Sequence, residues 1–170
     1  DGSAVPVEYT STPILKEGKP DGAVVVFRDI SERIEMEQKQ HAAYEELEKL
    51  KVTYQLILDS AGEGIYGLDS QGRITFGNAA AEDIAGWRSD KVLGQKAHDV
   101  HHHSYPDGSH YPRDDCPIYA ALKDGEVHHV DNEVFWHADG SAVPVEYTST
   151  PILKNGKPDG AVVVFRDISK

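Results

Sequence analysis

Residues 139–169 read DGSAVPVEYTSTPILKNGKPDGAVVVFRDIS, and residues 1–31 repeat them with one difference, Glu17 in place of Asn155. In both copies the alternating segment SAVPVEYTSTPIL is typical of a strand with one buried face. The following Gly- and Pro-containing segment, KNGKPDG or KEGKPDG, predicts a turn. AVVVFRDI is apolar on both faces and predicts a central strand. The chain therefore carries the same β-hairpin twice, and each copy is built to belong to a sheet.

The composition is that of an ordinary soluble domain, with 39% hydrophobic and 27% charged residues. A formal net charge of -12 argues against a nucleic-acid partner, because phosphate binding needs clustered Lys and Arg. Cys116 is the single cysteine, so an intrachain disulfide is impossible, which fits a reducing compartment. We find no long apolar run and no signal peptide, and the chain begins in mid-pattern. We therefore expect a cytoplasmic fragment without a membrane segment, cut from a longer parent that is free to carry a membrane anchor elsewhere.

Residues 31–60 predict one long helix, because they are rich in helix formers and contain no Gly or Pro. Side chains at heptad spacing form a mostly apolar seam in a charged background. One interpretation is an amphipathic helix that packs on its own domain. We favour the other, a parallel coiled coil that joins two chains into a homodimer. The seam residues are Met36, Gln40, Ala43, Leu47, Leu50, Tyr54 and Ile57.

Residues 61–170 predict a compact α+β domain. GIYGLD and RITFGN flank a short turn and form a hairpin. Asn78 stands at the N-cap position of a short helix that ends at Gly86, and CPIYAALKDG predicts a second helix that ends at Gly125. A further strand and the second copy of the repeat complete a five-stranded antiparallel sheet, which we expect the helices to cover on one face.

This ordered set of features resembles the PAS family over about residues 53–169. GIYGLDSQGRITFGNAAAEDIAGWRSDKVLGQ is similar to the opening of a PAS domain, and the second repeat copy is similar to its close. The matching positions are Asn78, Gly86-Trp87, Gly94, Asp139-Gly140 and Asp167-Ile168-Ser169. The resemblance implies a PAS fold and a sensor module, of the kind that is often arranged in tandem and joined by coiled-coil linkers upstream of histidine kinases.

The resemblance also implies a role for the first repeat copy. Residues 1–30 are similar to the last two strands of a preceding, almost identical PAS repeat, followed by a signalling helix at 31–60 and the PAS domain at 61–170. We expect the first copy to pair with a sheet in another chain, either by swapping with the second copy or by adding to an exposed edge. The alternative is a hairpin that folds back locally. The signal-relay positions are Asp29, Ile30 and Ser31, with their equivalents Asp167, Ile168 and Ser169.

The segment AHDVHHHSYPDGSHYPRDDCPI concentrates five of the nine histidines within 13 residues and adds the cysteine. The i,i+3 and i,i+4 spacing from His98 would place two imidazoles on one face of a helix. Imidazole and thiolate ligands suit Zn, Cu or Fe. Two alternatives stay open: a solvated polar loop with a packed cysteine, and a redox-sensing thiol. The metal or ligand candidates are His98, His101, His102, His103, His110 and Cys116.

Known PAS cofactors give little guidance. A flavin bound through a cysteinyl adduct is disfavoured, because GNAAAED replaces the expected cysteine-bearing helix. Haem is doubtful, because the axial position falls near Asp114 and His110 lies one turn earlier. Tyr66, Trp87 and Trp136 are candidates for lining a pocket. The sequence thus predicts a non-enzymatic sensor of a small ligand, metal or redox state that relays to an effector such as a kinase. The alternative is a cofactor-free dimerisation and relay module.

Overall fold

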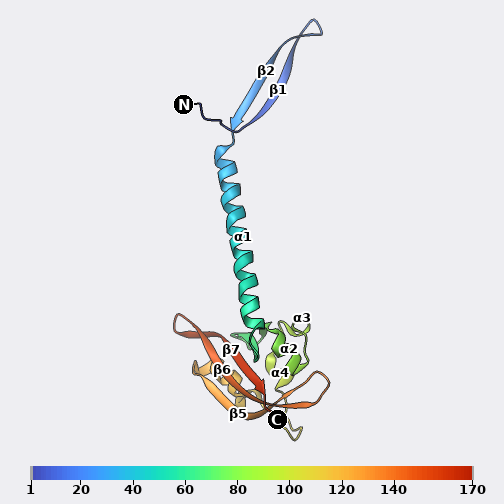
Figure 1. The fold of residues 1–170 in the computed structure, drawn as a ribbon, viewed down its shortest axis with the longest axis vertical. Helices are drawn as coiled ribbons and strands as arrows, with labels where there is room; N and C mark the ends of the chain where they lie inside the picture. The colour runs from blue at the N-terminus through green and yellow to red at the C-terminus, as the bar shows by residue number, and fades with distance from the viewer. Residues whose placement is uncertain (1, 170) are drawn as a thin grey trace. The chain divides into compact units, whose positions relative to one another are not determined.

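The computed structural model describes residues 2–169 and divides the chain into two compact units, one up to Thr53 and one from Tyr54. Figure 1 traces the elements in chain order. Their bounds are β1 Val7–Lys16, β2 Lys19–Asp29, α1 Ser31–Asp59, β3 Gly64–Asp69, β4 Ile74–Gly77, α2 Ala79–Ala85, α3 Ser89–Val92, α4 Ala97–His101, η1 Arg113–Asp115, α5 Pro117–Asp124, β5 His128–Trp136, β6 Ala142–Lys154 and β7 Lys157–Asp167.

The first unit contains the first repeat copy and most of the long helix. β1 and β2 pair antiparallel in a two-stranded sheet of their own. Helix α1 follows at once, because the Asp29 carboxylate accepts hydrogen bonds from the backbone N–H and the hydroxyl of Ser31, at 2.8 and 2.6 Å. The predicted helix at 31–60 thus occupies Ser31–Asp59.

The second unit contains a five-stranded antiparallel sheet in the order β4-β3-β7-β6-β5. This confirms the predicted α+β fold with one antiparallel sheet. The second repeat copy supplies the two central neighbours β6 and β7, which is why both faces of β7 are apolar. The core under the helices includes Phe135, Val145, Tyr147, Val163 and Phe165, all at most 2% exposed.

The local signals that predict the short helices are also confirmed. Asn78 caps α2 by accepting a hydrogen bond from the backbone N–H of Ala81 at 2.9 Å. Gly86 and Gly125 end α2 and α5 in the left-handed conformation, with φ of 68° and 74°. A residue with a Cβ is strained at these angles, so both helices stop where the sequence has glycine.

The segment between Lys96 and Cys116 differs from the solvated polar loop that is one interpretation of its sequence. Its first part forms α4, and His98 and His101 on this helix are only 9% and 4% exposed. Its last part forms the short 3-10 helix η1 directly before α5. The segment therefore belongs partly to the core, which moves several histidines out of solvent.

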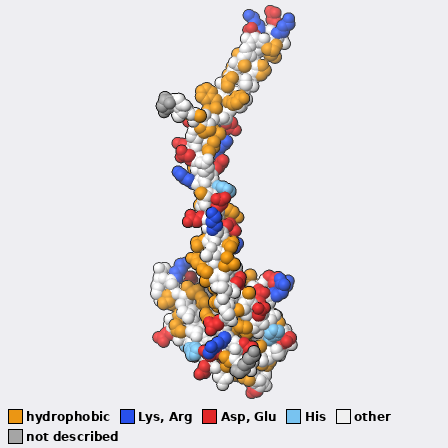
Figure 2. Space-filling model, in the orientation of Figure 1, with side chains coloured by type: hydrophobic (Ala, Val, Ile, Leu, Met, Phe, Trp, Pro, Cys, Tyr) orange, Lys and Arg blue, Asp and Glu red, His pale blue; other side chains and the backbone are white. Residues whose placement is uncertain are grey.

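The two repeat copies have the same strand register but different surroundings. Tyr9 pairs with Phe27 in the first copy, and Tyr147 pairs with Phe165 in the second. Phe27 is 71% exposed, whereas Phe165 is 2% exposed. Figure 2 shows hydrophobic side chains in the open along the hairpin β1–β2. Sequence and register are thus shared, while burial depends on the remaining strands and helices of the sheet.

Candidate functional site

A buried cluster of two histidines and the cysteine lies where α4 approaches the start of α5. His98 is the second residue of α4, His102 follows its last residue, and Cys116 directly precedes α5. One ligand atom from each of the three side chains lies within 4.8 Å of the others. His102 and Cys116 are each 1% exposed. The i,i+4 spacing therefore places two imidazoles beside the thiol, inside the protein.

The outer nitrogens of both imidazoles are held by groups that accept hydrogen bonds. His98 Nε2 lies 2.9 Å from the backbone oxygen of Tyr111. His102 Nε2 lies 2.9 Å from the Glu133 carboxylate, and His102 Nδ1 lies 3.1 Å from Cys116 Sγ. Because a carbonyl or carboxylate oxygen offers no proton, each Nε2 carries the hydrogen. Both rings thus keep Nδ1 for the centre of the cluster.

Glu133 anchors this arrangement to the sheet. It lies on β5, and its side chain is 16% exposed. Tyr111 donates its hydroxyl hydrogen to Oε1 at 2.7 Å, and Tyr147 of β6 donates to Oε2. The carboxylate therefore joins the His102 imidazole to two tyrosines, one of which lies on a central strand of the sheet.

Proton placement between Cys116 and His102 follows from these contacts. Burial disfavours a charged thiolate, but the neighbouring imidazoles of His102 and His98 outweigh this effect and lower the pKa of Cys116 to about 6. Burial likewise disfavours a charged imidazole, but hydrogen bonds to Cys116 and Glu133 outweigh it and raise the pKa of His102 to about 9. Both shifts favour a thiolate–imidazolium pair.

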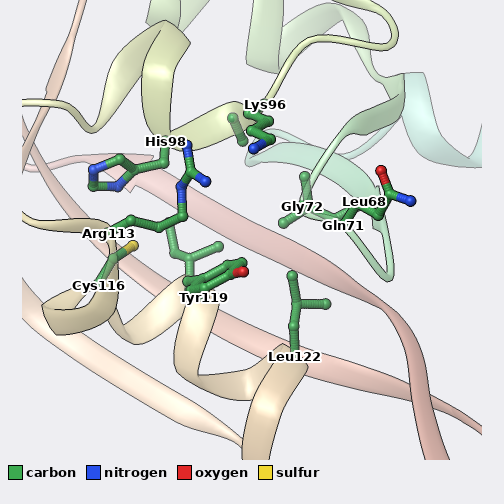
Figure 3. A pocket seen from close by; sticks show the side chains of 11 residues that line it. Leu68, Gln71, Gly72, Lys96, His98, Arg113, Cys116, Tyr119 and Leu122 are labelled. Atoms are coloured by element: carbon green, nitrogen blue, oxygen red, sulfur yellow. The ribbon is translucent and has the colours of Figure 1, made fainter.

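A small recess borders the cluster (Figure 3). His98 and Cys116 form one wall, and apolar side chains that include Tyr119 and Leu122 form another. In Figure 3, the Arg113 side chain lies between His98 and Tyr119. Cys116 lines this recess, although the residue itself is almost fully buried.

His101 faces a different part of the core. Its ring lies 4.5 Å from the Phe135 ring and 5.1 Å from the Tyr66 ring, measured between centroids. With Tyr66 and Trp87 it lines a second recess. Neither ring nitrogen of His101 has a hydrogen-bond partner, and burial lowers its pKa to about 3, so the ring is neutral.

The other predicted site residues lie apart from the cluster. His103 stacks on Trp136 and bonds the Ser104 hydroxyl, and Trp136 donates to the Ser104 carbonyl at 2.8 Å. His110 is exposed and forms a β-bridge with Ser104. Of the six predicted metal or ligand residues, the structure thus brings three together: His98, His102 and Cys116.

The predicted seam and relay residues occupy defined places. All seven seam residues lie on α1, and the larger apolar ones are widely exposed, with Met36 at 71% and Leu47 at 60%. The relay residues lie at the ends of β2 and β7 at equivalent positions, and Asp167 accepts a hydrogen bond from Ser169 as Asp29 does from Ser31. The seam therefore has no partner among the described residues of this chain, and the two exits share one local geometry.

Three residues of the site were not predicted from the sequence: Tyr111, Glu133 and Tyr147. A signal for Glu133 exists, because it stands two residues before Phe135 and thus on the inward face of β5. An acidic residue on an apolar strand face indicates a buried partner. Its partner His102 lies 31 residues away in the sequence, and no local pattern reveals that contact.

The structure is that of a sensor-type domain. Helices pack over one antiparallel sheet, and the buried cluster of His98, His102 and Cys116 lies within it. The chain belongs to the PAS family, whose model, described as PAS fold, matches residues 53–168. No helix among the described residues is long and apolar enough to cross a membrane.

Two curated relatives are similar to most of this chain, and the name of one describes a signal transduction protein. The chain is 29% identical over 157 residues to the probable diguanylate cyclase DgcE of Escherichia coli K12. It is 26% identical over 124 residues to the signal transduction histidine-protein kinase AtoS of the same organism. The matches cover 91% and 72% of this chain but only 13% and 19% of these relatives. The chain thus spans a small part of each.

Solved PAS domains show the same fold. The PAS domain of a Colwellia psychrerythraea protein has a TM-score of 0.56 and 20% identity, and covers 71% of this chain and 98% of that one. The PAS domain of nitrogen regulation protein NR(II) from Vibrio parahaemolyticus has a TM-score of 0.52 and 21% identity, and covers 67% and 96%. A PAS domain in signalling relatives supports a module of sensory signal transduction.

Proposed function

We propose that this chain is a non-enzymatic sensory module. The His98–His102–Cys116 cluster responds to a small ligand, a metal or the redox state of the thiol, and the response passes through the sheet to a helix and on to an effector such as a kinase. The observation that carries this proposal is the contact of the buried cluster with Glu133 of β5.

The route to the sheet is short. A change at Cys116 alters the charge on His102, which acts on Glu133 and thus on the Tyr147 hydroxyl of β6. β6 pairs with β7 from Val145 to Lys154, and β7 ends at Asp167. In the first copy the equivalent Asp29 leads directly into α1, so the strand end and a helix start share one rigid turn.

The hairpin β1–β2 and helix α1 also have a place in the proposed function. We propose that the hairpin β1–β2 forms the last strand pair of a PAS sheet, as β6–β7 does, and that α1 joins two PAS units as a signalling helix. The apolar seam of α1 supports a parallel coiled coil in a homodimer. The hairpin is free to pair in trans, because its sequence is interchangeable with that of β6–β7.

Amide hydrogen exchange of the whole chain tests the relay. The metal-free, reduced chain is compared with samples given Zn²⁺ or hydrogen peroxide, which oxidises a thiolate to sulfenic acid as its O–O bond breaks and hydroxide leaves. We expect exchange in β6–β7 and at the end of α1 to change with at least one stimulus. The Cys116→Ala variant should not respond. Unchanged exchange in the wild-type chain with every stimulus overturns the proposal.

A cofactor-free dimerisation and relay module is the second candidate function. The exposed apolar seam of α1 favours it, because such side chains gain most from a second copy. Sedimentation at several concentrations measures the dimer. A concentration-dependent dimer combined with no exchange response to any stimulus would select this function over sensing.

A further inference from the structure

We propose that His98, His102 and Cys116 bind one thiophilic transition-metal ion of the Zn²⁺ class through the two Nδ1 atoms and Sγ. This proposal rests on the proposed function for the location of the sensing centre, and it names the chemistry of that centre. Its basis is the geometry of three buried donor atoms and of the groups that orient them.

The first argument is an unsatisfied nitrogen. His98 is 9% exposed, its Nε2 is bonded to the Tyr111 carbonyl, and its Nδ1 has no hydrogen-bond partner. With the hydrogen fixed on Nε2, Nδ1 presents a lone pair to the protein interior. The thiol carries one hydrogen at most, and His102 Nδ1 already lies 3.1 Å from the sulfur. A cation bound between the three donors accepts the free lone pair of His98 Nδ1 and replaces the hydrogen that lies between His102 Nδ1 and the sulfur, which is released as a proton.

The second argument is distance. Three atoms that lie within 4.8 Å of one another all lie within about 2.8 Å of a common point, whereas Zn–N bonds are about 2.0–2.1 Å and Zn–S bonds about 2.3 Å. Movements of less than about 1 Å therefore complete the coordination. These movements need only small rotations of side chains, because α4 and the start of α5 already place the three residues around one point.

The third argument is the outer layer of contacts. Histidines that bind a metal usually donate their other N–H to a carboxylate or a backbone carbonyl, which fixes the ring and its tautomer. His102 meets the Glu133 carboxylate and His98 meets the Tyr111 carbonyl, both at 2.9 Å. Tyr111 and Tyr147 in turn hold Glu133. A solvated histidine loop has no need of such an arrangement.

The donor set selects the metal class. Two imidazoles and a thiolate suit Zn²⁺ or copper, whereas Ca²⁺ and Mg²⁺ prefer oxygen ligands. Three protein ligands leave one position of a tetrahedron open. The recess lined by His98 and Cys116 borders the cluster, and Lys96 lies on its wall, whereas the Arg113 guanidinium there pairs with Asp99 at 2.9 Å. Arg113 Nε is buried without a hydrogen-bond partner.

Titration of the metal-free, reduced chain with Co²⁺ and Zn²⁺ tests the site. We expect one Co²⁺ per chain with a thiolate-to-cobalt absorption band and the visible bands of tetrahedral cobalt. Zn²⁺ should displace it stoichiometrically. Because Cys116 is the only thiol, the band reports this sulfur alone. The absence of the band in the wild-type chain overturns the proposal without any variant.

Variants then locate the other ligands. Cys116→Ser and His98→Gln should each weaken Zn²⁺ binding by at least about 100-fold, and Glu133→Gln by about 10- to 100-fold while the thiolate band remains. His103→Gln and His110→Gln are matched controls from the same segment and should bind as the wild type does. Equal losses in the controls, or tight binding by Cys116→Ser, would refute the assignment. Thermal unfolding of each metal-free variant identifies any that fail to fold.

The two proposals fail in different ways. If cobalt binds through the thiolate but hydrogen exchange in β6–β7 and α1 never changes, the metal site stands and the sensory function fails. If cobalt does not bind but peroxide changes the exchange, the sensory function stands and the metal site fails.

Discussion

Replacement of Asn78 by alanine should destabilise the PAS unit by about 3 kcal/mol and loosen the end of α1. The Asn78 side chain is 1% exposed and makes four hydrogen bonds. Its Oδ1 accepts from the backbone N–H groups of Ile65 and Ala81, at 2.8 and 2.9 Å. Its Nδ2 donates to the carbonyls of Leu58 and Glu63, at 2.8 and 3.0 Å. One amide thus ties α1, β3 and α2 together.

The magnitude follows from these bonds. Loss of an N-cap costs about 1 kcal/mol. Each of the other three bonds is part-buried and is worth about 0.5–1 kcal/mol. The variant Asn78→Asp keeps both acceptor bonds but sets a carboxylate against two carbonyl oxygens. We expect a similar loss of unfolding free energy at neutral pH. This loss should be smaller in acid, where the protonated carboxyl can again donate a hydrogen bond to a carbonyl oxygen.

Urea unfolding measured by circular dichroism gives the free energy, and amide hydrogen exchange reports the last turn of α1. Asn132→Ala is the control, because Asn132 is an exposed asparagine of the same unit. A loss below about 1 kcal/mol for Asn78→Ala, or a loss equal to that of the control, would show that water replaces these bonds without penalty. The junction would then not depend on this amide.

Three further predictions use matched positions. Phe165→Ala should lower the free energy of unfolding by about 3–5 kcal/mol, and Phe27→Ala by less than about 0.5 kcal/mol, both measured by urea unfolding. A large loss of stability for Phe27→Ala would show that the first copy is buried in a partner. Gly160→Ala should cost about 1–3 kcal/mol by the same assay, because its Cβ overlaps a β3 carbonyl oxygen; wild-type stability would contradict this. Leu47→Ala should raise the dissociation constant of the proposed α1 dimer by on the order of tenfold or more in sedimentation, whereas Val52→Ala, which is off the seam, should leave it unchanged. Equal effects of the two variants would exclude the seam.

The sequence predicts those parts of the fold that are specified locally. Alternation and Gly-Pro turns define the strands, and Asn78, Gly86 and Gly125 mark helix ends because capping and positive φ involve neighbouring residues only. The order of these elements then leads to one sheet with helices on one face. The order of the strands within the sheet was not deduced from any local pattern.

The site was predictable only in part. The i,i+4 spacing of His98 and His102 indicates that the two rings share a face, but not that the face is buried. Burial arises because the Tyr111 carbonyl and Glu133 satisfy the rings, and these groups lie 13 and 31 residues from the histidines that they bind. A polar side chain is buried only where partners exist, so its burial is a tertiary property that composition does not reveal.

The duplicated hairpin shows, within one chain, the difference between local structure and tertiary burial. Both copies have the same sequence but for one residue, and their strands pair in the same register, so strand identity and register are local properties. Phe27 and Phe165 nevertheless differ from 71% to 2% in exposure. A two-stranded hairpin is marginal in water because it buries too little apolar surface. Strand β7 is stabilised by β3 and the helices that cover it, whereas β2 has no such cover among the described residues of this chain, which is why Phe165→Ala should cost far more than Phe27→Ala.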